Sequence, residues 1–160
     1  MRKPRARTCT REATLVQVAA VCFRRQEGST EFLLVRTSSG RWTFPKGRLE
    51  DGLSHAEVAA LEAFEEGGVE GKVDSRPIGR YLHRKESLSG FGSKDVTVVA
   101  FLLEVKRSAL PSESHRTPRW FTATEAKRRL AHRRPDKYLR GMKLVFDSAL
   151  HQIARKHPHK

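Results

Sequence analysis

Short blocks of apolar residues near the start of the chain predict β-strands. The segment Thr14–Phe23 is apolar and rich in β-branched residues, and Glu31–Arg36 repeats that character. Glycine and serine occur between them, in Gln26–Thr30, so the two segments are expected to form a hairpin. A turn at Thr37–Gly40 then precedes a short strand, Arg41–Phe44, which a proline ends.

The pattern then changes to that of a helix. A loop with two glycines, Lys46–Leu53, is followed by Ser54 and Glu57 at the spacing of a capping box, which marks a helix N-terminus. The next residues are strong helix formers as far as Glu66, and the pair Gly67–Gly68 predicts the end of the helix. We therefore expect a strand–loop–helix unit in this part of the chain.

Two more strands are expected at residues 72–83 and 95–105. The second is so apolar that it should lie in the middle of a sheet. The segment between them, Arg84–Lys94, is rich in Gly, Ser and Lys and predicts a mobile loop.

Helical patterns return near the C-terminus. After a short strand at Arg119–Phe121, Thr122 and Glu125 form a second capping box and open a helix to about His132. A longer helix is expected after Pro135. Its apolar residues recur at helical spacing on one face: Leu139, Met142, Phe146, Leu150 and Ile153. This mixture of strands and helices predicts an α/β or α+β sandwich.

The composition agrees with one soluble globular domain. The chain has 160 residues, of which 38% are hydrophobic and 31% charged, enough for one core and short for two. We expect a flexible basic arm at residues 1–13 and a single domain at residues 14–156. Without a signal-peptide pattern or an apolar run of roughly 20 residues, we expect a cytoplasmic protein and no membrane span. Cys9 and Cys22 lack the spacing of a zinc site and are expected to be free thiols.

The formal net charge of +14 is concentrated at the two ends of the chain. Residues 1–12 contain five Lys or Arg and one Glu, and residues 125–160 contain eleven Lys or Arg and three acidic residues. Such ends attract polyanions, namely nucleic acid, nucleotides or polyphosphorylated small molecules. A solvated basic surface without a partner is the alternative interpretation.

Three glutamates near the end of the central helix are the main candidates for chemistry. Glu62 precedes Glu65 by three residues and Glu66 by four, so their carboxylates are expected to share one helix face. They also lie at the negative end of the helix dipole, so a positive partner is expected. Carboxylate oxygens suit Mg²⁺ or Mn²⁺, which share their coordination with substrate phosphates. An ordinary solvated acidic face is the alternative, and the glycine-bearing loop that leads into this helix argues against it.

Residues 47–69 resemble the Nudix box. Its pattern is Gly, five residues, Glu, seven residues, Arg-Glu, an aliphatic residue, any residue, Glu-Glu, any residue, Gly and an aliphatic residue. Counted from Gly47, the matches are Glu62, Ala63 (a small stand-in for the aliphatic residue), Glu65, Glu66, Gly68 and Val69. The segments Arg41–Gly47, Phe32–Val35 and Arg119–Phe121 are also similar to Nudix hydrolases, chiefly to the diadenosine-polyphosphate and diphosphoinositol-polyphosphate branches. The resemblance covers about residues 14–150.

The resemblance implies a Nudix-type α/β/α sandwich with a mixed central sheet, and a metal-dependent pyrophosphohydrolase that cleaves a phosphoanhydride bond. It implies that Glu62, Glu65 and Glu66 hold the metal ions, with the Lys46 carbonyl as a further ligand. One glutamate of this cluster would be the general base, and Glu113 is a second candidate. Six basic residues are candidates for phosphate binding, although each is also consistent with a simple surface charge: Arg36, Arg41, Lys46, Arg48, Arg116 and Arg119.

Two positions depart from the Nudix box. The first Glu of the box is Leu53 here, and its Arg is Leu61. In the family these polar residues brace the loop and orient the catalytic glutamate. The two leucines are about two helical turns apart, so we expect them to lie along the same side and to replace the polar brace by an apolar contact. Because the metal-binding carboxylates are intact, we expect activity, at the usual or at a reduced level.

Alternative functions stay open at this point. A nucleoside triphosphate or RNA 5′-end pyrophosphohydrolase is the alternative within the enzyme class. A catalytically weak nucleotide- or nucleic-acid-binding Nudix module is the rival from another class, favoured by the basic ends and by the two leucines. Trp42 and Trp120 are candidates either for stacking on a base or for core packing. The sequence is compatible with a monomer or a homodimer.

Overall fold

The computed structural model describes residues 15–86 and 92–158, so the predicted basic arm and Cys9 lie outside the described residues. The strands are β1 (Val16–Gln26), β2 (Ser29–Arg36), β3 (Trp42–Thr43), β4 (Lys46–Arg48), β5 (Val69–Val73), β6 (Gly79–Glu86), β7 (Ser93–Ser108) and β8 (Arg119–Thr122). The helices are α1 (His55–Gly67), α2 (Ala123–Ala131) and α3 (Asp136–Lys156), with a short 3-10 helix η1 (Ser114–Arg116) before β8.

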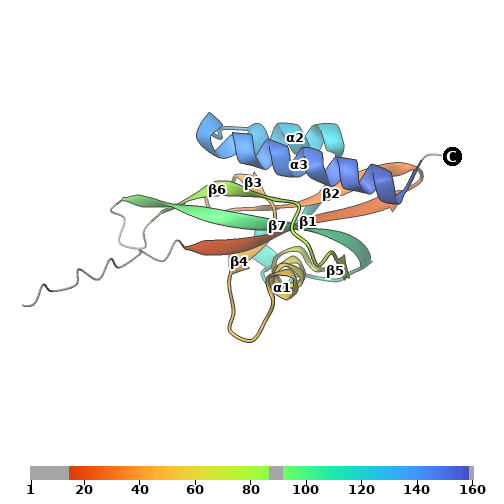
Figure 1. Ribbon diagram of the computed structural model, residues 1–160, viewed down its shortest axis with the longest axis horizontal. Helices are drawn as coiled ribbons and strands as arrows, with labels where there is room; N and C mark the ends of the chain where they lie inside the picture. Colours follow the sequence, from red (N-terminus) through yellow and green to blue (C-terminus); the bar gives the residue numbers. More distant parts are fainter. Residues whose placement is uncertain (1–14, 87–91, 159–160) are drawn as a thin grey trace, which may run out of the picture.

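One mixed sheet forms the middle layer of the molecule (Figure 1). Its strands follow the order β3-β2-β1-β7-β5, with β4 beside β1, β6 beside β7 and β8 beside β2. Strands β1 and β7 are parallel, whereas the other pairs are antiparallel. The predicted mixed sheet is confirmed, and the apolar strand expected at residues 95–105 lies inside it as part of β7.

Strand β1 is buried on both faces because it has neighbours on both sides and helices above and below. Its residues at positions 18, 20 and 22 belong to one apolar cluster, and those at 19, 21 and 23 belong to the other. This alternation follows from the two-residue period of a strand. Cys22 is a buried free cysteine, and burial raises the pKa of its thiol, so it packs as a small apolar residue.

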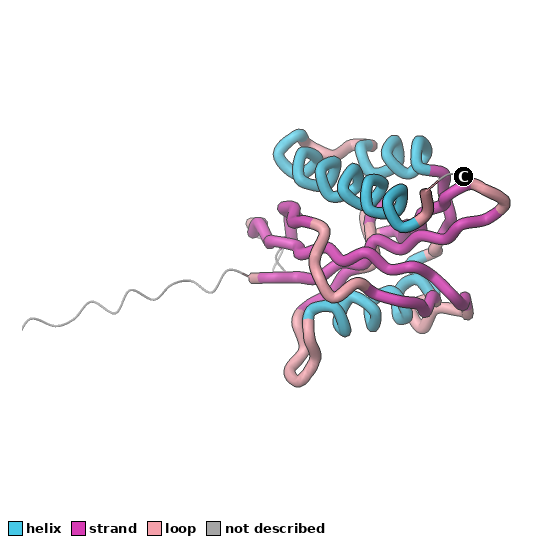
Figure 2. Tube along the Cα trace, turned by 45° about the vertical axis from the view of Figure 1, so that its right-hand side comes forward, coloured by secondary structure: helices cyan, strands magenta, loops and turns pink. Residues whose placement is uncertain are grey.

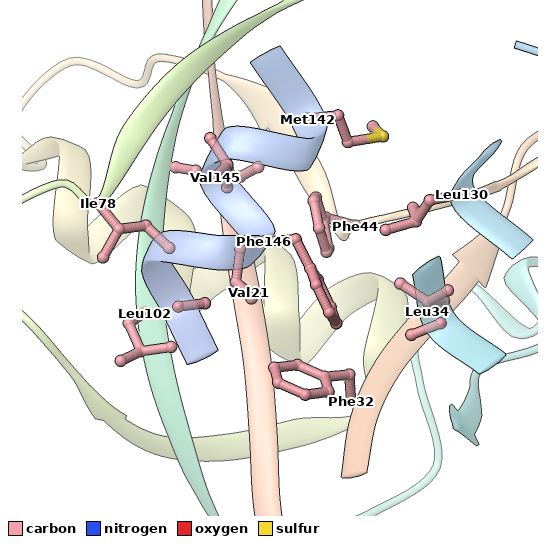
Figure 3. Packing of buried hydrophobic residues seen from close by; sticks show 14 of the residues in the cluster. Val21, Phe32, Leu34, Phe44, Ile78, Leu102, Leu130, Met142, Val145 and Phe146 are labelled. Carbon is pink, nitrogen blue, oxygen red and sulfur yellow. The ribbon is translucent and has the colours of Figure 1, made fainter. Parts of the chain in front are cut away.

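Helices cover both faces of the sheet (Figure 2). Helix α1 packs on one face, and α2 and α3 pack on the other. In the core under α3, the rings of Phe32 and Phe146 lie 4.6 Å apart, and Phe44 belongs to the same cluster (Figure 3). The predicted α/β/α layering is confirmed.

Helix α3 is amphipathic, as its apolar period predicts. Four of the five residues expected on its inner face are buried, and Leu150 is half-buried against the same core. An ion pair forms at each end of the helix: Lys137 binds Asp95 of β7, and Lys156 binds Asp74, the residue after β5. Within the described residues, no helix is long and apolar enough to cross a membrane.

The single strand expected at residues 72–83 is wrong, because two strands occupy this region. Strand β5 ends at Val73, and β6 begins only at Gly79. Pro77 lies between them and has no N–H to donate to a strand ladder. Both strands nevertheless pair with the same strand, β7. Its 16 residues are long enough to pair first with β6 and then with β5.

Three other predicted segments, two loops and one strand, have different bounds in the structure. The loop expected at Lys46–Leu53 begins with a strand, β4, which pairs with β1 at Ala19↔Lys46. The strand expected at Arg41–Phe44 is reduced to two residues. Both ends of the loop expected at Arg84–Lys94 belong to the β6–β7 pairing, and residues 87–91 lie outside the described residues.

Candidate functional site

The central helix and the strand before it meet at the candidate site. Helix α1 begins where Ser54 Oγ accepts the N–H of Glu57 at 3.1 Å, as the capping box predicts. It ends at Gly68, whose φ of 66° is left-handed and favours glycine. With both ends fixed, the second half of α1 lies against β4, to which the segment 49–54 connects it (Figure 1).

Glu62 is held against the backbone of Gly47. Its side chain is buried, with a residue exposure of 8%. A Cβ at position 47 would lie 2.8 Å from Glu62 Oε2 and closer still to the other two atoms of the carboxylate. A glycine at position 47 therefore leaves room for the carboxylate in the position that it occupies here.

Glu66, one helical turn later, is fixed by two groups. Its Oε2 accepts the backbone N–H of Lys46 at 3.1 Å, and its Oε1 lies 3.6 Å from the guanidinium of Arg116. Glu66 is 5% exposed. Strand β4 thus contacts both buried glutamates of α1, through Gly47 and Lys46.

The electrostatics of the site favour a bound cation. Burial, and then repulsion by Glu66 and Glu65, raise the pKa of Glu62 to about 7. Burial also raises the pKa of Glu66, against the opposing effect of Arg116. A cation near these carboxylates would remove the cost of their charge. Burial lowers the pKa of the Lys46 amine to about 8, although Glu66 partly offsets this.

The donor set fits a hard divalent cation. Carboxylate oxygens and backbone carbonyls are the ligands that Mg²⁺ and Mn²⁺ take from proteins, and Mg²⁺ completes its coordination with water and substrate phosphate. Among the described residues, no three acidic, His or Cys side chains converge into a preformed metal cage. The described residues therefore supply only part of the coordination shell of such an ion.

Glu65 and Glu113 lie beside these two carboxylates. The backbone N–H of Glu113 donates to the carbonyl of Glu65 at 3.0 Å. Arg116 Nε donates to Glu113 Oε2 at 3.1 Å, so this arginine links Glu113 to Glu66. The segment before β8 is thereby attached to the end of α1. The four predicted catalytic glutamates thus lie on neighbouring segments without converging on one point, and their roles stay predictions.

The predicted phosphate-binding residues do not all lie beside the carboxylates of Glu62 and Glu66. Lys46 and Arg116 contact the carboxylate group, and Arg48 is exposed on β4. Arg36 lies over the ring of Trp42, with 4.8 Å from its guanidinium carbon to the ring centroid. Two more lie elsewhere: Arg41 is exposed after the β2–β3 turn, and Arg119 is exposed on β8 opposite Leu34.

The tryptophans are already packed against side chains of the protein. Trp42 is buried and meets Phe121 edge-on at 5.0 Å. Trp120 is half-buried, with the Arg24 guanidinium 4.1 Å from its ring centroid. Core packing thus accounts for Trp42, and a cation–π contact covers one face of Trp120.

Two residues near the site carried no sequence signal. Arg134 donates to the carbonyls of Leu130 and Trp42, which ties the α2–α3 connection to β3. His83 on β6 is half-buried, and burial together with Lys46 and Arg134 lowers its pKa to about 3. Its imidazole is therefore neutral at physiological pH. The sequence alone assigns no role to a single Arg or His, because the pairing of the strands decides which residues surround it.

The two leucines that depart from the Nudix box, Leu53 and Leu61, do not both lie where the sequence predicts. Leu53 precedes the cap residue Ser54, so it is not part of the helix, and it is 36% exposed. Leu61 is on α1 and half-buried. The expectation that both lie along one side of the helix is therefore wrong for Leu53, and a contact between them stays a prediction.

Comparisons with known proteins show what this chain is similar to. The family model described as NUDIX domain matches residues 14–141. The bis(5'-nucleosyl)-tetraphosphatase [asymmetrical] of Sus scrofa is 36% identical over 117 residues, which are 66% of this chain and 78% of that protein. Nudix hydrolase 13, mitochondrial, of Arabidopsis thaliana is 37% identical over 92 residues, 52% of this chain and 44% of that protein. The matched part thus spans less than half the length of this second relative.

A solved structure has the same fold. The binary complex of the C. elegans Ap4A hydrolase superposes with a TM-score of 0.61 and 20% sequence identity, over 88% of this chain and 98% of that one. The predicted enzyme class, a hydrolase of phosphorus-containing acid anhydrides, agrees with the family and with these relatives. Because the family model matches residues 14–141, which are most of the chain, this chain belongs to the NUDIX domain family.

Proposed function

We propose that this protein is a divalent-metal-dependent pyrophosphohydrolase that cleaves a phosphoanhydride bond in a dinucleoside polyphosphate or a diphosphoinositol polyphosphate. The observation that carries the proposal is the arrangement of Glu62 and Glu66 around the backbone of Gly47 and Lys46. The tetraphosphatase named among the relatives supports the dinucleoside polyphosphate as the first substrate to test.

The residues divide into those that hold the metal and those that orient them. Glu62, Glu65 and Glu66, with the Lys46 carbonyl, would hold Mg²⁺ or Mn²⁺. The bound ion would supply a water of lowered pKa and neutralise charge on the substrate phosphates. The Lys46 N–H fixes one oxygen of Glu66, which orients that carboxylate.

Arg116 and Glu113 form the other side of the proposed site. Arg116 lies between the carboxylates of Glu113 and Glu66 and holds both in place. A glutamate of the α1 cluster accepts the proton of the attacking water, with Glu113 as the second candidate. Lys46, beside Glu66, supplies positive charge for the substrate phosphates.

Replacement of Glu66 by Gln tests the proposal. With Mg²⁺ and diadenosine tetraphosphate, Glu66→Gln should lower kcat by at least about 100-fold, because a ligand charge is lost. Glu57→Gln, an exposed change in the first turn of the same helix, is the matched control and should keep wild-type kcat. Equal activity of the two variants, or no metal-dependent hydrolysis by the wild type, would reject the proposal.

A second candidate is the catalytically weak nucleotide- or nucleic-acid-binding module. It is favoured by the apolar residues at positions 53 and 61, where the box has a polar pair. A substrate panel that adds a nucleoside triphosphate, a diphosphoinositol polyphosphate and a 5′-triphosphorylated RNA distinguishes the alternatives. Binding of nucleic acid without hydrolysis of any member would support the module. The cytoplasmic location and the oligomeric state stay predictions.

A further inference from the structure

A groove of about 140 Å³ lies between helices α2 and α3. Its floor consists of four buried apolar residues, Leu130 of α2 and Leu139, Met142 and Phe146 of α3. The side chains of Leu130, Met142 and Phe146 appear in Figure 3. Three charged residues complete the lining and are exposed: Lys127 of α2, and Lys143 and Asp147 of α3. We name this feature the α2–α3 groove.

The α2–α3 groove is separate from the carboxylate site. Helix α1, which carries Glu62 and Glu66, packs on the opposite face of the sheet from α2 and α3 (Figure 1). The lining of the groove contains none of the predicted catalytic or phosphate-binding residues. The groove therefore has no part in the proposed hydrolysis, and its occupant need not be the substrate.

The rim of the α2–α3 groove carries a surplus of positive charge. Asp147 is the only acidic residue that lines it, and its Oδ1 lies 3.0 Å from Lys127 Nζ, which neutralises it. Lys143 and Arg140, which are about one helical turn apart on α3, are exposed. Neither of these two belongs to an ion pair among the described residues. An acidic partner therefore complements this rim.

An exposed leucine lies beside these cations. Residues 140, 143, 144 and 147 follow the spacing i, i+3, i+4 and i+7, so they share one side of α3. Leu144 is 69% exposed. A single exposed leucine needs no explanation by itself, whereas apolar area bordered by polar residues is typical of an interaction site. The buried floor of the groove and Leu144 together supply such area next to Lys143 and Arg140.

The size of the groove indicates what fits into it. An apolar cavity of about 150 Å³ holds one benzene molecule, so about 140 Å³ accommodates one large apolar side chain. Nucleic acid fits less well, because bases stack on exposed aromatic rings, and the only aromatic residue in the lining, Phe146, is 1% exposed. We propose that the α2–α3 groove docks an acidic segment of a partner protein, which inserts one large apolar side chain and places its carboxylates near Lys143 and Arg140.

A synthetic peptide of Glu and Ala with one central Phe is the probe that tests the proposal. Titrated into the full chain and followed by amide NMR, it should shift the signals of the groove residues and leave those of Glu62 and Glu66 in place. Replacement of its Phe by Ala should raise Kd at least about tenfold, because the buried apolar area is lost. Lys143→Glu should raise Kd about fivefold through the reversed charge. The matched control Arg155→Glu makes the same change on an exposed residue about three turns further along α3, and should change Kd less than about twofold.

The proposal is overturned if the peptide shifts no signal of the groove at millimolar concentration, or if the version without Phe binds as tightly. The same holds if Arg155→Glu weakens binding as much as Lys143→Glu, because the attraction would then come from net charge alone. Oligouridylate that shifts the same signals with a lower Kd than the peptide would identify a nucleic-acid surface, and would also reject the proposal. The outcome is independent of the proposed function, since no arm of the experiment measures hydrolysis.

Discussion

A methyl group at position 47 should disable the site without unfolding the protein. In Gly47→Ala, the new Cβ would lie 2.8 Å from Glu62 Oε2 and closer to the other atoms of that carboxylate. Cβ atoms essentially never approach a neighbour to less than 3.0 Å, so the carboxylate must move. The obstacle is the end of a flexible side chain, so the backbone of β4 and α1 can stay in place.

The size of the effect follows from this displacement. The carboxylate has to move by about 1 Å, and a misplacement of that size in a reacting group costs about 100-fold in rate. We therefore expect kcat with Mg²⁺ and diadenosine tetraphosphate to fall about 100-fold. The melting temperature should change by no more than a few degrees, since alanine also lowers the entropy of the unfolded chain.

The matched control is another glycine-to-alanine change, Gly141→Ala in α3. Its Cβ would lie 2.9 Å from Cα and Cβ of Tyr81 and 3.1 Å from the carbonyl of Arg80, on the other side of the sheet. This variant should lose stability and keep its kcat below the melting transition. If Gly47→Ala retains a kcat within about threefold of the wild type, the inference that Gly47 makes room for a working Glu62 is refuted.

Three further predictions concern pH, the box leucines and the core. Because the folded pKa of Glu62 is raised from 4.5 to about 7, the metal-free protein should lose unfolding free energy as pH rises through that window. The loss should be at most about 3 kcal/mol, reduced by solvent screening and absent in Glu62→Gln, as chemical denaturation would show. Leu53→Glu and Leu61→Arg should be better tolerated together than singly in a double-mutant stability cycle, and simple additivity would contradict this. Phe146→Ala should cost about 3–5 kcal/mol, whereas Leu144→Ala, at 69% exposed, should cost under about 0.5 kcal/mol by the same measurement.

The sequence by itself determined the features that depend on near neighbours. Ser54 and Gly68 fix the start and end of α1, because capping needs only groups within about one helical turn. The apolar period of α3 predicts its buried face for the same reason. The spacing from Gly47 to Glu62 carries the resemblance to the Nudix box.

Only the tertiary structure decided how distant segments meet. The division of residues 72–83 into β5 and β6, and the pairing of β4 with β1, depend on partners that no local pattern names. Arg116 reaches Glu66 from 50 residues further along the chain, and Arg134 reaches Trp42 across 92 residues. Charges distributed over separate elements become a site only when the sheet brings them together, since electrostatic attraction at the protein surface acts over about 10 Å and not along the sequence.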